Sequence, residues 1–170
     1  MPVATSEYIY PGFLEAYFVP TIASSALIPT AVEVNAGTRL TTVNGGLLPD
    51  GLQGFSFKTQ WVKKRIMADA IELNIPGPDQ LADSTLVFNR IPTTAESAKK
   101  TALAKAANGF LVIFGQGIAG ASPAAGDKCD VWPGTSGGPN DTFTGGLAEA
   151  ARWEVGWGAS QRPVKAVTLT

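Results

Sequence analysis

The chain has 170 residues, of which 45% are hydrophobic and only 16% are charged, and its net charge is −1. With no histidine and a single cysteine, it has no imidazole metal ligand or near-neutral proton shuttle, and too few thiols for a zinc site or an internal disulfide. Composition therefore predicts no cofactor and argues against an enzyme. A charged share below the usual ~25% indicates that other subunits cover part of the surface.

Short strands are predicted along most of the chain, because apolar or alternating segments are separated by Gly and Pro residues. In chain order we expect strands over residues 13–19, 55–61, 65–75, 84–91, 110–114, 128–132, 147–157 and 164–169. Residues 55–61 alternate, with Phe57 and Trp61 on the side that is expected to be buried. The Pro76-Gly77-Pro78-Asp79 run is expected to end the strand before it.

Helical patterns occur in two places. Residues 29–34 predict one helical turn that stops at Gly37, and residues 94–107 predict the one long helix. Thr93 and Glu96 have capping-box spacing at its start. Its expected apolar stripe is Ala98, Ala102, Leu103 and Ala106. Strands with hairpin-length gaps and one flanking α-helix predict a mainly β fold, an antiparallel β-sandwich or barrel.

The length fits a single domain, which we expect over residues 13–170. Residues 1–12 are polar and aromatic with a Pro-Gly hinge, which predicts an N-terminal arm; a frayed terminus is the alternative. Weakly patterned stretches predict long loops near residues 38–51 and 115–146. Loops of such length are commonly functional, or become ordered only when a partner binds.

Two glycine-rich motifs resemble functional sites but lack the context that those sites need. Residues 115–120 spell G-x-G-x-x-G after a strand, yet Ser122 and Pro123 follow where a dinucleotide site requires a helix. Residues 134–139 look like the nucleophile segment of chymotrypsin-like proteases, but the chain has no histidine to act as the base. We interpret both as flexible or turn-forming segments.

Residues 29–41, Pro-Thr-Ala-Val-Glu-Val-Asn-Ala-Gly-Thr-Arg-Leu-Thr, resemble the N-terminal portion of major tail tube proteins of long-tailed bacteriophages, particularly those that infect actinobacteria. The order of elements is similar over nearly the whole chain, including the single mid-chain helix. The resemblance implies a structural virion protein with a β-sandwich fold. It also implies assembly into hexameric rings, in which the inner sheets of the six copies join into a continuous β-barrel. These rings would stack into the tube that conducts the genome.

The resemblance further implies partners and a location. These are the tape measure protein inside the tube, tail terminator and distal tail proteins at its ends, and double-stranded DNA in transient, non-specific passage. The chain would reside in the virion tail after assembly in the host cytoplasm. A net charge of −1 agrees with this role, since each phosphate contact would slow the passage of DNA. No stretch reaches the ~18 apolar residues of a membrane span, so we expect no membrane anchor.

Candidate contact residues fall into two groups. The polar face of the predicted strand 65–75 suggests three residues that line the lumen, although the outer surface is the alternative: Asp69, Glu72 and Asn74. Contacts between rings are expected from the N-terminal arm and the first long loop, at Glu7, Tyr8, Tyr10, Arg39 and Asp50.

Two other classes of function stay open. The chain could be another β-rich virion component, such as a head-tail joining or capsid decoration protein, or a small β-sandwich module whose aromatic residues bind carbohydrate or peptide. Carboxylates and lysines alone can support catalysis, but the chain shows no acid-base constellation that would do so.

Overall fold

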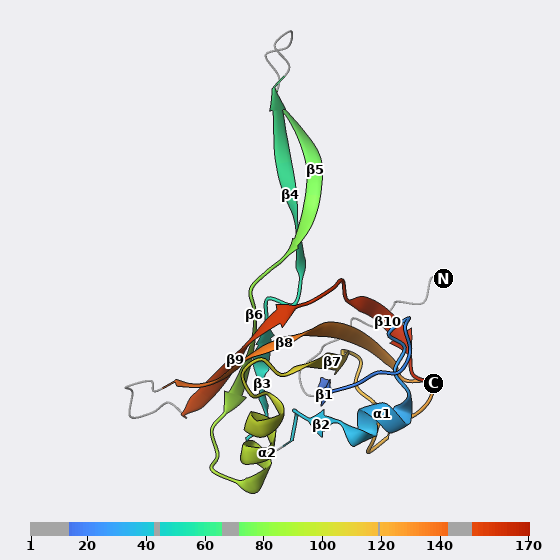
Figure 1. The fold of residues 1–170 in the computed structure, drawn as a ribbon, viewed down its shortest axis with the longest axis vertical. Coiled ribbons are helices and arrows are strands. Elements are labelled where there is room, and N and C mark those ends of the chain that lie inside the picture. The colour runs from blue at the N-terminus through green and yellow to red at the C-terminus, as the bar shows by residue number, and fades with distance from the viewer. Residues whose placement is uncertain (1–13, 43–44, 66–71, 119, 143–150) are drawn as a thin grey trace, which may run out of the picture.

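In the computed structural model, residues 14–42, 45–65, 72–118, 120–142 and 151–170 are described. They form a body of antiparallel β-structure with few helices, from which a two-stranded hairpin projects (Figure 1). The strands are β1 (Glu15–Val19), β2 (Thr38–Arg39), β3 (Leu47–Gln53), β4 (Phe57–Arg65), β5 (Glu72–Leu81), β6 (Ser84–Asn89), β7 (Asn108–Phe114), β8 (Lys128–Thr142), β9 (Arg152–Ala159) and β10 (Val164–Thr168). The helices are α1 (Ala31–Ala36) and α2 (Thr94–Ala102).

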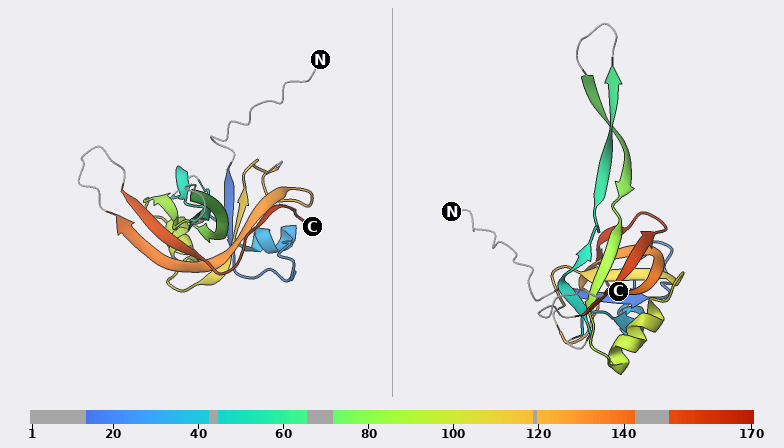
Figure 2. Two further views of the ribbon diagram at one scale, coloured as in Figure 1. Left: turned by 90° about the horizontal axis from the view of Figure 1, so that it is seen from above. Right: turned by 90° about the vertical axis from the view of Figure 1, so that its left-hand side faces the viewer.

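The body contains one eight-stranded sheet in the order β2-β1-β7-β8-β9-β6-β3, with β10 paired to β8. Strand β8 links the two halves of this sheet. Its first residues pair with β10, and its second half, from Gly134 to Thr142, pairs with β9. The sheet curves as a result (Figure 2). Among the described residues the order ends at β2 and β3, and no closed barrel is formed.

Both faces of the central strands are buried, and each faces its own hydrophobic cluster. In β7, Leu111 and Ile113 belong to one cluster, while Val112 and Phe114 belong to the other. The first cluster includes Leu103, which follows α2, and the second includes Val34 of α1. Burial on both faces explains why the sequence of β7 is continuously apolar instead of alternating.

Both helices form where the sequence predicts them. Helix α1 begins with a complete capping box, in which Thr30 accepts from the Glu33 N–H and the Glu33 carboxylate accepts from the Thr30 N–H. Helix α2 begins at the predicted cap, Thr93, but ends at Ala102, earlier than expected. The reason is a contact with β8: Ser136 donates its hydroxyl to the Leu103 carbonyl, and its carbonyl accepts from the Ala106 N–H.

The structure of the β4–β5 hairpin differs from two expectations. This hairpin is called the arm from here on, and it is distinct from the N-terminal arm predicted over residues 1–12. Among the described residues these strands pair only with each other, so Trp61 is not buried but 63% exposed. Strand β5 also continues through Pro76 and Pro78, where an end was expected. A two-stranded ribbon tolerates proline because each strand has one open edge, and a register shift between Thr59 and Trp61 accommodates the one extra residue of β5.

The two expected long loops are shorter than predicted. Residues 38–51 contain β2 and most of β3, and β8 extends to Thr142 inside the stretch 115–146. The continuation of β8 was not predicted because its second half is polar and rich in glycine, yet this half pairs with β9, with one register shift between Ser136 and Pro139. The beginning of the strand expected over residues 147–157 lies outside the described residues. No helix in the described part of the chain has the length and apolar character needed to cross a membrane.

Candidate assembly surface

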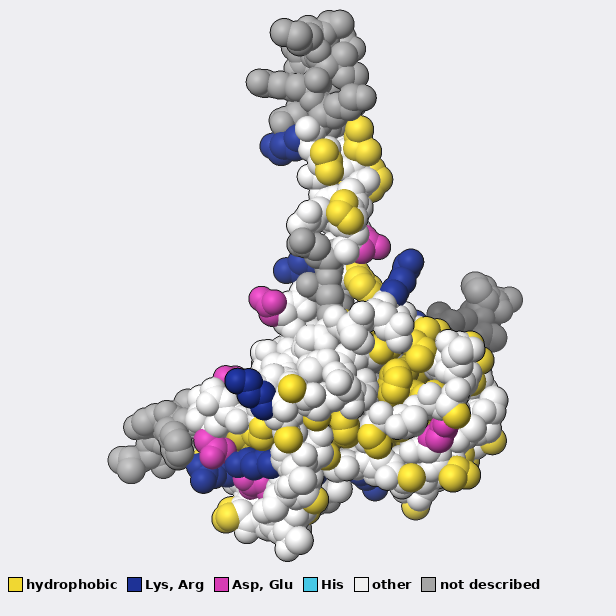
Figure 3. Space-filling view, in the orientation of Figure 1, with side chains coloured by type: hydrophobic (Ala, Val, Ile, Leu, Met, Phe, Trp, Pro, Cys, Tyr) yellow, Lys and Arg dark blue, Asp and Glu magenta, His cyan; other side chains and the backbone are white. Residues whose placement is uncertain are grey.

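The arm presents large apolar side chains to the outside. Val62 is 53% and Ile75 43% exposed, and the two are direct cross-strand partners, so they share one face. Trp61 is paired with Pro76 on the opposite face. Figure 3 shows hydrophobic side chains along the arm. A two-stranded hairpin is only marginally stable alone in water, so a surface of this kind calls for cover from another chain.

A short hydrogen-bonded neck joins the arm to the body. The Ser84 hydroxyl lies 3.1 Å from the Gly54 carbonyl and 3.1 Å from the Ala82 carbonyl, and the Ala82 N–H donates to the Ser56 carbonyl at 3.2 Å. Gly54 has a φ of +76°, and a Cβ there would lie 1.9 Å from the Asp83 carbonyl oxygen. Glycine is therefore required where the chain leaves the body for the arm.

Aromatic packing supports the base of the arm. Phe57 stacks on Trp132 with ring centroids 6.0 Å apart, and Phe55 meets the same ring edge-on at 5.3 Å. Trp132 is 2% exposed, so the arm is anchored on the body core.

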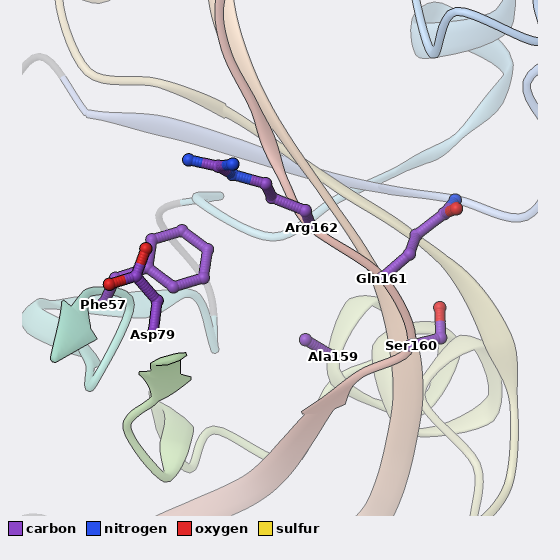
Figure 4. Close-up of a pocket in the computed structure, with 6 residues that line it drawn as sticks. All are labelled: Phe57, Asp79, Ala159, Ser160, Gln161 and Arg162. Carbon is purple, nitrogen blue, oxygen red and sulfur yellow. The ribbon is translucent and has the colours of Figure 1, made fainter. Parts of the chain in front are cut away.

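An open cavity of about 430 Å³ lies beside this base. It is lined by Phe57, Asp79, Ala159, Ser160, Gln161 and Arg162. Arg162 extends from the turn after β9 toward the side where Phe57 and Asp79 lie (Figure 4), while Asp79 accepts a hydrogen bond from the Thr59 hydroxyl at 2.8 Å. The cavity is thus a cleft between arm and body with one acidic and one basic wall. No group of three potential metal ligands occurs among the residues that the structure describes.

A buried lysine holds the segment between β2 and β3. Lys99 of α2 is 1% exposed, and its Nζ donates to the Thr42 hydroxyl at 2.6 Å and to the Gly45 carbonyl at 2.8 Å. Burial lowers the pKa of Lys99, and the nearby Glu96 carboxylate opposes this shift. The segment is held further by a hydrogen bond from the Asn89 N–H to the Gly46 carbonyl. Helix α2 therefore holds Thr42 and Gly45, which lie in a stretch that was expected to be a long loop.

The buried face of α2 differs from the expected apolar stripe. Leu103 of the expected stripe is buried, but Ala98 is exposed, and the charged Glu96 and Lys99 are buried as well. Glu96, Lys99 and Leu103 are three and four residues apart, so they lie on one side of the helix, and this spacing was the available signal in the sequence. The burial of Glu96 and Lys99 was not predicted, because charged residues are seldom buried unless they are paired.

Charged side chains connect α2 with the ends of β8 and β9. Lys100 Nζ lies 2.7 Å from Asp141 Oδ1 and 2.9 Å from Glu96 Oε1, and it lies over the Trp153 ring. Arg90 is 3.8 Å from the other carboxylate oxygen of Asp141. The hydrogen bond from Lys100 lowers the pKa of Asp141. This cluster fastens the polar half of β8 to the helix.

The structure describes four of the predicted contact residues. Arg39, in β2, donates from Nε to Glu15 at 2.9 Å, and that hydrogen-bonded carboxylate raises the pKa of Arg39. Asp50 is exposed in β3. Asn74 is exposed on the arm, opposite Lys63, and Glu72 is the first residue of β5, opposite Arg65. The remaining candidates lie outside the described residues: Glu7, Tyr8, Tyr10 and Asp69.

The four described candidates are thus spread over β2, β3 and the arm, and the structure does not bring these four into one site. Their roles at the lumen or between rings stay predictions. Sequence reasoning missed the exposed Val62 and Ile75, because it treated alternating apolar residues as core positions of the same chain.

Comparisons with known proteins agree on the class of the chain. A family model described as phage tail tube protein matches residues 3–170. Among solved structures, the fold is similar to a chain in the cryo-EM structure of the anti-feeding prophage (AFP) baseplate, 6-fold symmetrised, with a TM-score of 0.57 and 8% identity. The match covers 96% of this chain and 99% of that chain. No curated protein matches the sequence.

Proposed function

The chain belongs to the phage tail tube protein family, and on this basis we propose that it polymerises as stacked hexameric rings that form the tail tube, the conduit for genome ejection. Membership makes it a structural component of the phage tail. The observation that carries the finer proposal is the arm, whose exposed Trp61, Val62 and Ile75 have no covering layer among the described residues. Assembly with further copies would supply that layer.

The open sheet supports a ring. Strands β2 and β3 end the sheet order, and unpaired strand edges are normally blunted, covered or paired with another chain. Joining sheets from several copies into a barrel would remove such edges. Six copies are favoured because the fold is similar to a chain from an assembly that was symmetrised six-fold.

A DNA conduit fits the charge of the chain. A net charge of −1 provides no general attraction for phosphate, which a passage for DNA must avoid. The tape measure protein is the proposed occupant before ejection, and tail terminator and distal tail proteins are the proposed neighbours at the two ends. The virion tail is the proposed location, with assembly in the host cytoplasm.

The lumen assignment of Asp69, Glu72 and Asn74 stays a prediction. The register places Glu72 opposite Arg65 and Asn74 opposite Lys63, so this part of the arm carries residues of both charge signs. If the three residues line the lumen, replacing Asp69 and Glu72 by lysine should leave assembly intact and slow DNA ejection. Unimpaired infectivity would place them on the outside.

Sedimentation of the purified chain over micromolar to near-millimolar concentration tests the proposal. We expect large particles, seen as rings or tubes by negative-stain electron microscopy. The variant Val62→Lys, which puts a charge on the apolar face of the arm, should stay folded and remain small. Ala104→Lys adds the same charge at an exposed position of the body and should assemble like the wild type. A compact 17.7 kDa monomer at every concentration would contradict the proposal.

A second candidate is a tail-tube-like ring of a baseplate, because the similar solved chain comes from a baseplate. Such a component would form single rings that do not stack into tubes under the same conditions. The lengths of the particles in the micrographs distinguish the two candidates.

A further inference from the structure

The large exposed hydrophobic side chains of the described residues lie in two separate places. One is the arm, and the other is the region of α1, where Val32 is 79% and Ile28 36% exposed. Figure 1 shows α1 at the lower right of the body, away from the projecting arm, and the view from above in Figure 2 shows it at one side of the body. Figure 3 shows hydrophobic side chains over the same part of the body.

The surface around α1 is almost free of charge. Residues 20–38 include a single charged side chain, Glu33, and residues 110–126 include none; Asp127 follows directly and accepts a hydrogen bond from the Ala124 N–H at 2.9 Å. The two segments meet where the Asn35 side-chain amide donates to the Pro123 carbonyl at 2.9 Å. We name the exposed apolar side chains of this surface the α1 corner; they are Ala26, Ile28, Val32, Ala36, Ala124 and Ala125.

The two carboxylates in this region, Glu33 and Asp127, already accept hydrogen bonds within the chain. Glu33 accepts hydrogen bonds from the backbone N–H groups of Ala23 and Thr30, both at 2.8 Å, and these donors lower its pKa. Its carboxylate is therefore committed to the helix cap and to the segment before it. A surface that exposes Val32 and carries no basic side chain attracts neither DNA nor an anionic membrane, and it favours an apolar partner.

We infer that the Val62–Ile75 face of the arm of one copy docks on the α1 corner of a second copy. The inference rests on the proposed function and names the surfaces that join the copies. The two patches match in character, because Val62 and Ile75 are uncharged cross-strand partners.

The geometry makes this contact one between different copies. The arm projects away from the body, and β4 alone spans about 30 Å at ~3.3 Å per residue, so it reaches a neighbour and leaves its own α1 corner uncovered (Figure 1). A contact between two different patches is heterologous, and it repeats from copy to copy without pairing off into dimers. Such a contact can join many copies into one assembly, as a tube requires.

Cysteine cross-linking in the assembled protein tests the contact. The double variant Val32→Cys/Val62→Cys should give a ladder of disulfide-linked chains under mild oxidation, because each arm meets the corner of the next copy. Neither single variant should give a ladder. The native Cys129 does not interfere, because it is 2% exposed and burial raises the pKa of its thiol to about 12. The matched control pair, Ala104→Cys/Val62→Cys, should give no ladder.

Several outcomes would overturn the inference. Tubes that form normally while the Val32→Cys/Val62→Cys variant stays uncrosslinked would refute this contact and leave the proposed function standing. Dimers from Val62→Cys alone would show arm-to-arm pairing, and a ladder from the control pair would show a different or non-specific surface. Val32→Cys that reacts with a maleimide equally fast in tubes and in monomeric protein would show that the α1 corner stays uncovered. Failure to form any assembly contradicts the proposed function itself.

Discussion

The rings of Phe88 and Trp153 stack with centroids 4.0 Å apart and an angle of 9° between their planes. They are direct partners in the pairing of β6 with β9, and neither side chain is exposed to solvent. Lys100 lies over the same Trp153 ring and connects it to Asp141. One aromatic pair therefore joins the sheet to α2 and to the end of β8.

Replacing Trp153 by Ala should destabilise the chain by about 3–5 kcal/mol, because it leaves a cavity in the core and removes the stack on Phe88. The measurement is denaturant unfolding at neutral pH. Trp153→Phe should cost clearly less, since it keeps an aromatic ring and removes an indole N–H that has no partner among the described residues. A loss below ~1 kcal/mol for the alanine variant would show that this face is not core.

Gly134→Ala should also destabilise the fold, by about 1–3 kcal/mol through overpacking. A Cβ at this position would lie 2.5 Å from the Gly158 carbonyl oxygen and 2.5 Å from Nε1 of Trp157, which is buried and cannot move aside. Gly156 is the control, because a Cβ there meets nothing within 4 Å. Thermal unfolding should separate the two variants, and equal melting temperatures would contradict the packing described.

Lys99→Met should release the segment between β2 and β3 while the fold persists. Methionine has a similar length but cannot donate to Thr42 or Gly45, and an unpaired buried acceptor costs about 1–3 kcal/mol. Hydrogen exchange at the Asn89 N–H, which bonds to Gly46, should accelerate about tenfold or more. Lys105→Met, at an exposed position, should leave that rate unchanged. Equal protection of the Asn89 N–H from exchange in both variants would show that Lys99 does not hold the segment between β2 and β3.

Low pH should lower the stability of the folded chain, partly through protonation of Asp141. The hydrogen bond from Lys100 lowers the pKa of this carboxylate, so the folded state holds it ionised more firmly than the unfolded state does. Its contribution is complete above the unfolded pKa of about 3.9 and is lost as the pH falls through the lower folded value. Asp141→Asn should be less stable than wild type at pH 7, with a smaller difference near pH 2. A difference that does not change with pH would contradict the ion pair.

Periodicity and capping were sufficient to predict most of the body. The predicted cap Thr93 begins α2, and the strand predicted over residues 84–91 forms as β6, in which Leu86 and Phe88 are buried. These signals are local: each depends on residues a few positions apart, and the backbone geometry follows from them.

The features important for assembly were harder to predict, because they depend on which surfaces meet. Alternation shows that Trp61 needs cover but not whether the same chain supplies it, and Pro76 can sit in a strand only because the arm has open edges. Lys99 was missed for a related reason. Its burial depends on acceptors at Thr42 and Gly45, which are distant in the sequence.

End-on electron micrographs of the assembled wild-type chain test the central claim most directly. We predict class averages with six-fold symmetry around an open centre, and side views in which such rings repeat along a tube. A different rotational symmetry, a filled centre, or a protein that stays monomeric under all conditions would contradict the assignment of this chain as a subunit of a hexameric tail tube.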